Sequence, residues 1–128
     1  MKKLFKIVLF SVGMLFFQSC YYDTVIVDEG EIIPPPDDIS YSEQIMPIWA
    51  DYCVNCHKGA VAPDLRPANS YNALLNGGYV LVGDADNSIL YHSLLGTNGV
   101  PLMPPGAKLS STNIGLVKGW IDQGAKNN

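Results

Sequence analysis

The chain has 128 residues, of which 48% are hydrophobic and 16% are charged, and its formal net charge at pH 7 is −4. A chain of this length has room for one small domain. The acidic balance provides no basic field for nucleic acid, so we expect no nucleic-acid partner.

Residues 1–19 have the form of an export signal. A basic start is followed by an apolar run from Ile7 to Phe17, which is too short to span a bilayer. The run is followed by Ser19-Cys20, which resembles a bacterial lipobox, where the cysteine is acylated and becomes the new N-terminus. We therefore expect a lipoprotein anchored through Cys20 to a bacterial membrane, facing the periplasm or the cell surface. The alternative is ordinary signal cleavage nearby, which would leave a soluble periplasmic protein.

Residues 20–39 have the composition of a tether. Three consecutive prolines, Pro34 to Pro36, favour a stiff polyproline II spacer. The segment carries acids and no base, and the acids are Asp23, Asp28, Glu29, Glu31, Asp37 and Asp38.

Residues 40–128 form the predicted domain, which is close to neutral. Its acids are Glu43, Asp51, Asp64, Asp84, Asp86 and Asp122, and its bases are Lys58, Arg66, Lys108, Lys118 and Lys126. We expect no one-signed face that would steer a charged partner over distance.

The domain begins with a predicted short amphipathic helix. Ser40 and Glu43 have the spacing of a capping box, and an apolar periodicity follows. Pro47 falls inside this pattern, so either the helix starts near Pro47 or its first turn is kinked there. In both cases the helix runs directly into Cys53.

Cys53-Val54-Asn55-Cys56-His57 is the C-x-x-C-H sequence to which c-type haem is attached. Two thiols at this spacing can add to the two vinyl groups on one edge of a porphyrin. The histidine that follows them is then held beneath the ring, where its imidazole can ligate the iron. We expect one haem, covalently bound through Cys53 and Cys56, with His57 as the proximal iron ligand.

Three other sites use part of this motif. A thioredoxin-like redox pair would follow a strand in a βαβ unit, whereas this pair ends a helical stretch. A structural zinc needs four ligands, and the exported chain offers only Cys53, Cys56, His57 and the distant His92. A disulfide between Cys53 and Cys56 would close a very small loop and stabilise little.

After the motif, the pattern predicts loops that alternate with short helices. The expected elements are a loop over 60–69, a helix over 71–75 capped by Ser70, an extended segment over 79–82, a turn over 83–88, a helix over 89–95 ended by Gly96, a Pro/Gly-rich loop over 97–106, and a helix over 111–123 capped by Ser110 and ended by Gly124. Gly115 and Gly119 should weaken the last helix, or else mark a close contact with another element.

The second axial position of the iron has two candidate ligands. Met103 lies in Val100-Pro101-Leu102-Met103-Pro104-Pro105-Gly106, where the prolines stiffen the loop and can present one side chain in one place. Its thioether is a soft ligand that favours ferrous iron. His92 lies within an expected helix, where a packed or surface histidine is the ordinary outcome. Met46 precedes the motif and is expected in the core.

Five stretches together resemble a class I cytochrome c, and more narrowly the planctomycete-type cytochrome c domain found in bacterial lipoproteins. They are Ile45 to Trp49, Cys53 to His57, Gly83 to Ser88, Met103 to Pro105, and Leu109-Ser110 through Ala125. The resemblance implies a small all-α fold with the terminal helices packed around one haem, and His57 and Met103 as axial ligands.

The resemblance also implies supporting contacts. The carbonyl of Pro63 or Pro67 is expected to orient the His57 ring. Arg66, Tyr71 and Tyr79 are available to the haem propionates, although a solvated arginine and packed tyrosines are the ordinary roles of these residues. The side chains expected around the haem or across the terminal helices are Trp49, Tyr52, Leu94, Val117, Trp120 and Ile121.

We therefore predict an electron carrier and no enzyme, with an iron that cycles between Fe(III) and Fe(II) and an unidentified redox protein as partner. It can equally serve as a relay module for a separate oxidoreductase. The alternative function is a haem-based sensor or binding module for a small ligand, with an open sixth coordination site.

Overall fold

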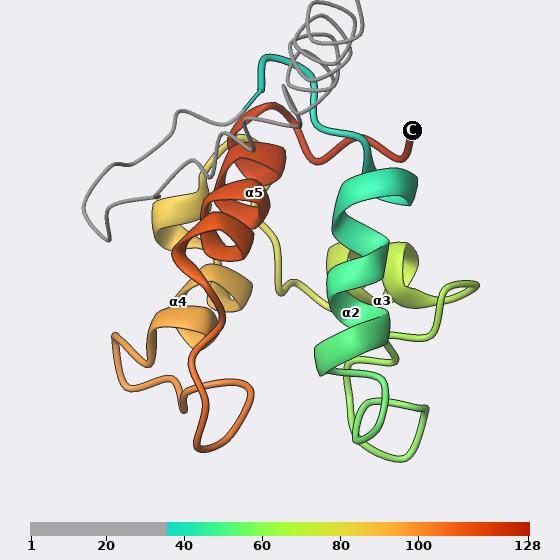
Figure 1. The fold of residues 1–128 in the computed structure, drawn as a ribbon, viewed down its shortest axis with the longest axis vertical. Helices are drawn as coiled ribbons and strands as arrows, with labels where there is room; N and C mark the ends of the chain where they lie inside the picture. The colour runs from blue at the N-terminus through green and yellow to red at the C-terminus, as the bar shows by residue number, and fades with distance from the viewer. Residues whose placement is uncertain (1–35) are drawn as a thin grey trace, which may run out of the picture. The chain divides into compact units, whose positions relative to one another are not determined.

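The computed structural model describes residues 36–128 (Figure 1). The predicted signal peptide, Cys20 and most of the tether lie outside the described residues. Within residues 36–128 the chain forms helices and loops without a strand, which confirms the predicted all-α class for this part. The segment 79–82, predicted to be extended, forms no strand. No helix in the described part is both long and apolar enough to cross a membrane.

The first helical segment consists of a π-helical turn, η2 (Tyr41–Ile45), followed by α2 (Met46–Tyr52). The Ser40 hydroxyl accepts a hydrogen bond from Glu43 N at 3.3 Å, as the capping signal predicts. In a capping box, the Glu43 side chain would accept a hydrogen bond from Ser40 N in return. Here Gln44 takes this role, and its Oε1 accepts from Ser40 N at 2.9 Å.

The wide π turn explains how the chain accommodates Pro47. Met46 N–H donates to Tyr41 O, which lies five residues earlier. This turn therefore encloses one residue more than a turn of α-helix. A proline inside a regular α-helix lacks an N–H and clashes with the carbonyl four residues before it. Pro47 lies in the first turn of α2, and the widened turn before it removes the conflict. The predicted irregularity at Pro47 is therefore present as a π turn.

The other helices are α3 (Ser70–Asn76), the 3₁₀ turn η3 (Ala85–Asn87), α4 (Ile89–Leu95) and α5 (Ser111–Asp122). The predicted end signals hold for the last two. Gly96 ends α4 with a φ of 67° in the left-handed region that suits glycine. The Ser110 hydroxyl caps α5 by accepting from Asn113 N at 3.2 Å.

Ser70 was predicted to cap α3, and this prediction was wrong. Ser70 is the first residue of α3 and is fully buried. Its hydroxyl accepts a hydrogen bond from the Tyr41 hydroxyl at 2.7 Å. This buried pair joins the first helical segment to α3, across a separation in sequence that local patterns do not reveal.

The core is formed where η2 and α4 pack against α5, as Figure 1 shows for α4 and α5. Tyr41 packs against Tyr71 and Trp120, with ring centroids 5.3 and 5.1 Å apart. Five of the six predicted core side chains are buried, namely Trp49, Leu94, Val117, Trp120 and Ile121. The sixth, Tyr52, is 51% exposed.

The last residues of the predicted tether pack onto the domain. Ile39 is buried, and its N–H donates to Gln123 Oε1 at 3.0 Å. The Gln123 amide in turn donates to Pro36 O at 2.7 Å. The packed domain therefore includes the residues just before Ser40, which contact the end of α5.

Candidate functional site

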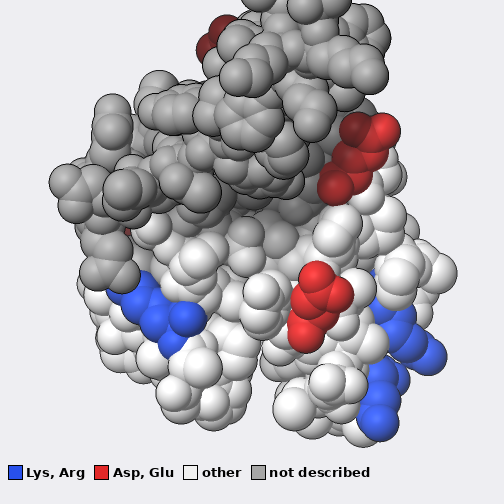
Figure 2. All heavy atoms as spheres, in the orientation of Figure 1, with Lys and Arg blue, Asp and Glu red and all other residues white. Residues whose placement is uncertain are grey.

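A cavity of about 390 Å³ lies between the loop that follows α2 and the loop that follows α4. Its volume is within the range of small-molecule and cofactor sites. Cys53, Cys56, His57 and Met103 all line this cavity. Figure 2 shows the surface hollowed between the two loops, with uncharged side chains along both sides of the hollow on this face.

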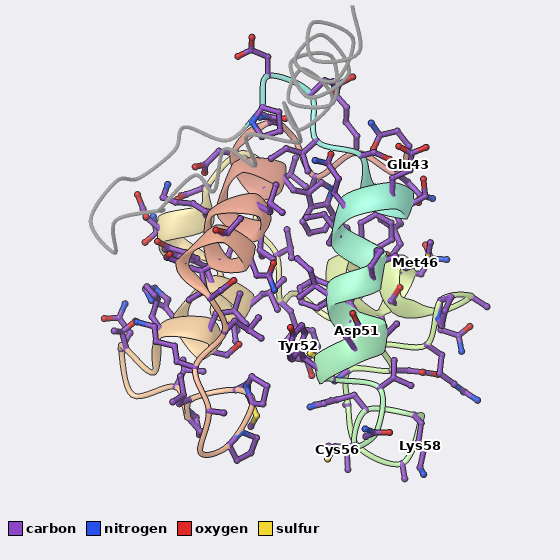
Figure 3. All side chains as sticks on the ribbon, viewed as in Figure 1. Glu43, Met46, Asp51, Tyr52, Cys56 and Lys58 are labelled. Atoms are coloured by element: carbon purple, nitrogen blue, oxygen red, sulfur yellow. The ribbon has the colours of Figure 1, made fainter. Side chains whose placement is uncertain are left out.

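The motif turns tightly at the end of α2. Cys53 N–H donates to Trp49 O at 2.9 Å, and the amides of Cys56 and His57 both donate to Cys53 O, at 3.1 and 3.0 Å. Figure 3 shows Tyr52 projecting from the end of α2 and Cys56 in the turn below it. Cys53 is half-buried, Cys56 is exposed, and both are free thiols. The turn therefore places both cysteines in the lining of one cavity.

The His57 ring is oriented by the loop that follows it. His57 Nδ1 lies 3.1 Å from Pro63 O. Because a carbonyl oxygen can only accept, Nδ1 carries a proton, and in the neutral ring the lone pair available to a metal is then that of Nε2. The loop is closed by a second hydrogen bond, from Leu65 N to His57 O at 2.8 Å. Of the two prolines considered, Pro63 makes this contact, and the lining of the cavity does not include Pro67.

The Cys53 thiol has the wrong acidity for thiol–disulfide exchange. Burial, with a smaller contribution from the neighbouring Cys56, raises the pKa of Cys53 to about 11. Redox-active C-x-x-C pairs depend on a lowered thiol pKa, because the thiolate is the nucleophile. The raised pKa of Cys53 therefore disfavours a thioredoxin-like function in which this thiol is the nucleophile.

Met103 is fixed to α4 through its backbone. Met103 N–H donates to Ser93 O at 2.7 Å, which ties the loop to the middle of the helix. The preceding residue packs closely on the helix end, since a Cβ at Gly96 would lie 3.1 Å from Leu102 Cβ. The loop therefore has little freedom at the point where it supplies Met103 to the cavity.

The other candidate ligand, His92, and the expected core residue Met46 are placed elsewhere. His92 lies outside the lining of the cavity, and both of its ring nitrogens have partners. Nδ1 is 3.0 Å from Thr97 Oγ1, and Nε2 is 2.9 Å from Asn98 Nδ2. Met46 packs against the core and does not line the cavity, in agreement with its predicted role.

Among residues 36–128, no Lys, Arg, Asp or Glu lines the cavity. Arg66, one of the candidates for a haem propionate, instead forms a bidentate pair with Asp64 and is half exposed. This guanidinium holds the pKa of the Asp64 carboxyl below its usual range. Tyr71 donates to Ala125 O at 3.0 Å. Of the three residues considered for the propionates, only Tyr79 lines the cavity.

The remaining walls are apolar and were mostly absent from the sequence-based prediction. They include Ile89, Leu90, Val100 and Pro101. Leu90 and Leu94 are four residues apart and share one side of α4, a signal that could have predicted that wall. The contribution of Val100 and Pro101 follows from their position beside Met103.

Comparisons of the chain with protein-family models, with curated proteins and with solved structures found no match. Among residues 36–128, no three His, Cys, Asp or Glu side chains gather as a metal site. The function must therefore be argued from the cavity itself.

The residues present fit a covalently bound haem. Such a group requires an apolar cavity, two thiols at one edge, and axial donors that contact the same cavity. Cys53 and Cys56 provide the thiols, and His57 Nε2 and the Met103 sulfur are the available donors. A zinc site would need four convergent ligands, whereas a haem iron takes four of its ligands from the porphyrin.

Proposed function

We propose that this chain is a single-haem c-type cytochrome of the class I fold that transfers electrons at a bacterial membrane surface. The observation that carries the proposal is the orientation of His57. Its Nδ1 proton is held by Pro63 O at 3.1 Å, which leaves Nε2 available to the cavity that Met103 also lines. When bound, the haem would supply one-electron Fe(III)/Fe(II) chemistry.

The protein's own residues have distinct roles in this proposal. Cys53 and Cys56 would hold the group covalently, and the Pro63 carbonyl would keep His57 in one tautomer and one orientation. Met103 would supply a soft sixth ligand that favours the ferrous state. The apolar wall would exclude water, which raises the cost of each change of charge inside the cavity and thereby tunes the potential.

The location at a membrane rests on the N-terminal sequence. Cys20 would carry the lipid, and the Pro-rich tether would hold the domain away from the surface. The partner would be an unidentified redox protein that meets a nearly neutral domain. We propose no catalytic role for the chain itself.

The test is the mass and spectrum of the exported protein, produced in a bacterium that attaches c-type haem. The expected result is one covalent haem, a lipid on Cys20, and a low-spin spectrum that carbon monoxide does not change. A protein without covalent haem would overturn the proposal. A high-spin haem that binds carbon monoxide would favour the alternative, a small-ligand sensor with an open sixth site.

The role of Met103 can be isolated with a matched pair of variants. Met103→Leu preserves the apolar volume but removes the thioether, and such swaps usually disturb a fold little. We expect this variant to become high-spin and to bind carbon monoxide. Met46→Leu makes the same change in the core, away from the cavity, and should keep the parent spectrum. If Met103→Leu also keeps that spectrum, Met103 is not the ligand.

A further inference from the structure

The cavity poses a problem for the polar end of a haem. A haem carries two propionate carboxylates, and burial of a carboxylate is costly without a hydrogen-bond partner or an opposite charge. In the described part of the chain, no Lys or Arg lines the cavity. Any protein group that contacts a propionate from the lining must therefore be a neutral hydrogen-bond donor.

Most of the donors that line the cavity are already engaged. His57 donates to Pro63 O, and the Ser93 hydroxyl donates to Leu90 O at 2.6 Å. The Trp49 indole N–H has no hydrogen-bond partner within residues 36–128, but its nitrogen is fully buried beside the Tyr41 hydroxyl and is therefore not accessible from the cavity. Two accessible side-chain donors remain, the hydroxyls of Tyr52 and Tyr79.

These two tyrosines differ in their surroundings. Tyr52 is 51% exposed, so water can hydrate its hydroxyl. Tyr79 is half-buried, and its hydroxyl makes no hydrogen bond to another residue in the part of the chain that the structure describes. Its backbone is fixed on both sides, because Tyr79 N–H donates to Leu74 O at 3.0 Å and Leu90 N–H donates to Tyr79 O at 2.9 Å.

The Tyr79 ring is also held in place by the absence of a side chain at Gly77. A Cβ at Gly77 would lie 2.5 Å from Ala73 O, and 2.6 and 2.8 Å from Tyr79 Cε2 and Cδ2. Gly77 has a φ of −78°, which any residue can adopt. The φ of Gly77 therefore does not require glycine, but the space does, because the Ala73 carbonyl and the Tyr79 ring both lie too close for a Cβ.

We propose that Tyr79 donates a hydrogen bond to a haem propionate, and that Gly77 is the positioning residue that makes room for its ring. This inference rests on the proposed function, since it assigns residues to the haem. It extends that function by naming the group that binds the carboxylate end of the cofactor, and it predicts that a neutral phenol and no cation performs this role.

The test compares Tyr79→Phe with Tyr91→Phe in the haem-loaded, exported protein. Each variant removes one hydroxyl and keeps the ring of a half-buried tyrosine, and Tyr91 does not line the cavity. We expect Tyr79→Phe to shift the propionate carboxylate bands in the redox-difference infrared spectrum, assigned with haem labelled by ¹³C at the propionates. At pH 8 its midpoint potential should fall, because the carboxylate charge is less well neutralised and favours the ferric state. Tyr91→Phe should leave both properties unchanged.

Gly77→Ala provides a second approach that keeps the hydroxyl and moves the ring. It should shift the same infrared bands in the same direction as Tyr79→Phe. If Tyr79→Phe leaves the carboxylate bands and the potential at parent values, the inference is wrong, whatever the behaviour of Gly77→Ala. A parent protein with no covalent haem would instead overturn the proposed function, so the two failures are distinguishable.

Discussion

The buried hydrogen bond between Tyr41 and Ser70 offers a quantitative test of the structure. Tyr41 is 2% exposed and Ser70 is fully buried, and their hydroxyl oxygens are 2.7 Å apart. Burial, partly offset by the neighbouring Ser70 and Trp49, raises the pKa of Tyr41, so its hydroxyl stays protonated and donates at neutral pH.

Removal of either partner should destabilise the protein by a predictable amount. Tyr41→Phe loses a hydrogen bond worth about 1 kcal/mol and leaves the Ser70 hydroxyl buried without a partner, at a further cost of about 1 kcal/mol. We therefore expect a loss of about 2 kcal/mol in the free energy of unfolding. Ser70→Ala should cost about the same, because it leaves the Tyr41 hydroxyl unpaired.

The double variant distinguishes a buried pair from two independent contacts. Replacing both partners leaves no unsatisfied group, so Tyr41→Phe/Ser70→Ala should cost about 1 kcal/mol, well below the sum of the single variants. The assay is urea unfolding of the purified protein, followed by far-ultraviolet circular dichroism. Tyr91→Phe, at a half-buried tyrosine, is the control and should stay within about 0.5 kcal/mol of the parent. If the double variant instead loses as much free energy of unfolding as the two single variants together, the reasoning is wrong.

Two further predictions concern α5. A Cβ at Gly115 would meet no atom within 4 Å, whereas Gly124 has a φ of 101°. In the same urea assay, Gly115→Ala should therefore raise the free energy of unfolding by about 1 kcal/mol, and Gly124→Ala should lower it. Asp122 is partly buried, but hydrogen bonds from Lys118 and Ala85 N–H outweigh this and lower its pKa. Because the pKa of Asp122 is lower in the folded state than in the unfolded state, its ionised carboxylate stabilises the fold at pH values above the unfolded-state pKa of about 3.9. This stabilisation is lost as the pH falls from there through the folded-state pKa. Asp122→Asn should therefore lose less stability than the parent between about pH 5 and pH 3, and an equally steep loss in both proteins would contradict this assignment.

The helix ends could be predicted because their signals are local. Ser110 and Gly96 act through residues within a few positions, so the sequence alone identifies them. Ser70 shows the limit of this approach. A serine at the start of a helix reads as a cap, and only the approach of Tyr41 from a distant segment reveals that its hydroxyl is part of the core.

The site shows the same division between local and distant information. The motif residues and Met103 were identified from their chemistry and spacing, and the structure places all four around one cavity. The choice between Pro63 and Pro67 could not be made from sequence, because it depends on how the loop closes through Leu65 N and His57 O. The place of Tyr52 at the cavity, half exposed, likewise depends on the loops that it faces.

The closed loop from His57 to Leu65 would have a kinetic consequence if the proposed haem lies between His57 and Met103. The loop fixes His57 at both its backbone carbonyl and its ring, and Met103 is fixed by its own N–H to Ser93 O. Groups held this way move little when the charge between them changes, so the reorganisation energy of an electron transfer would be small. A low reorganisation energy allows rapid exchange at a small driving force, and it would let one domain accept and release electrons between partners of similar potential.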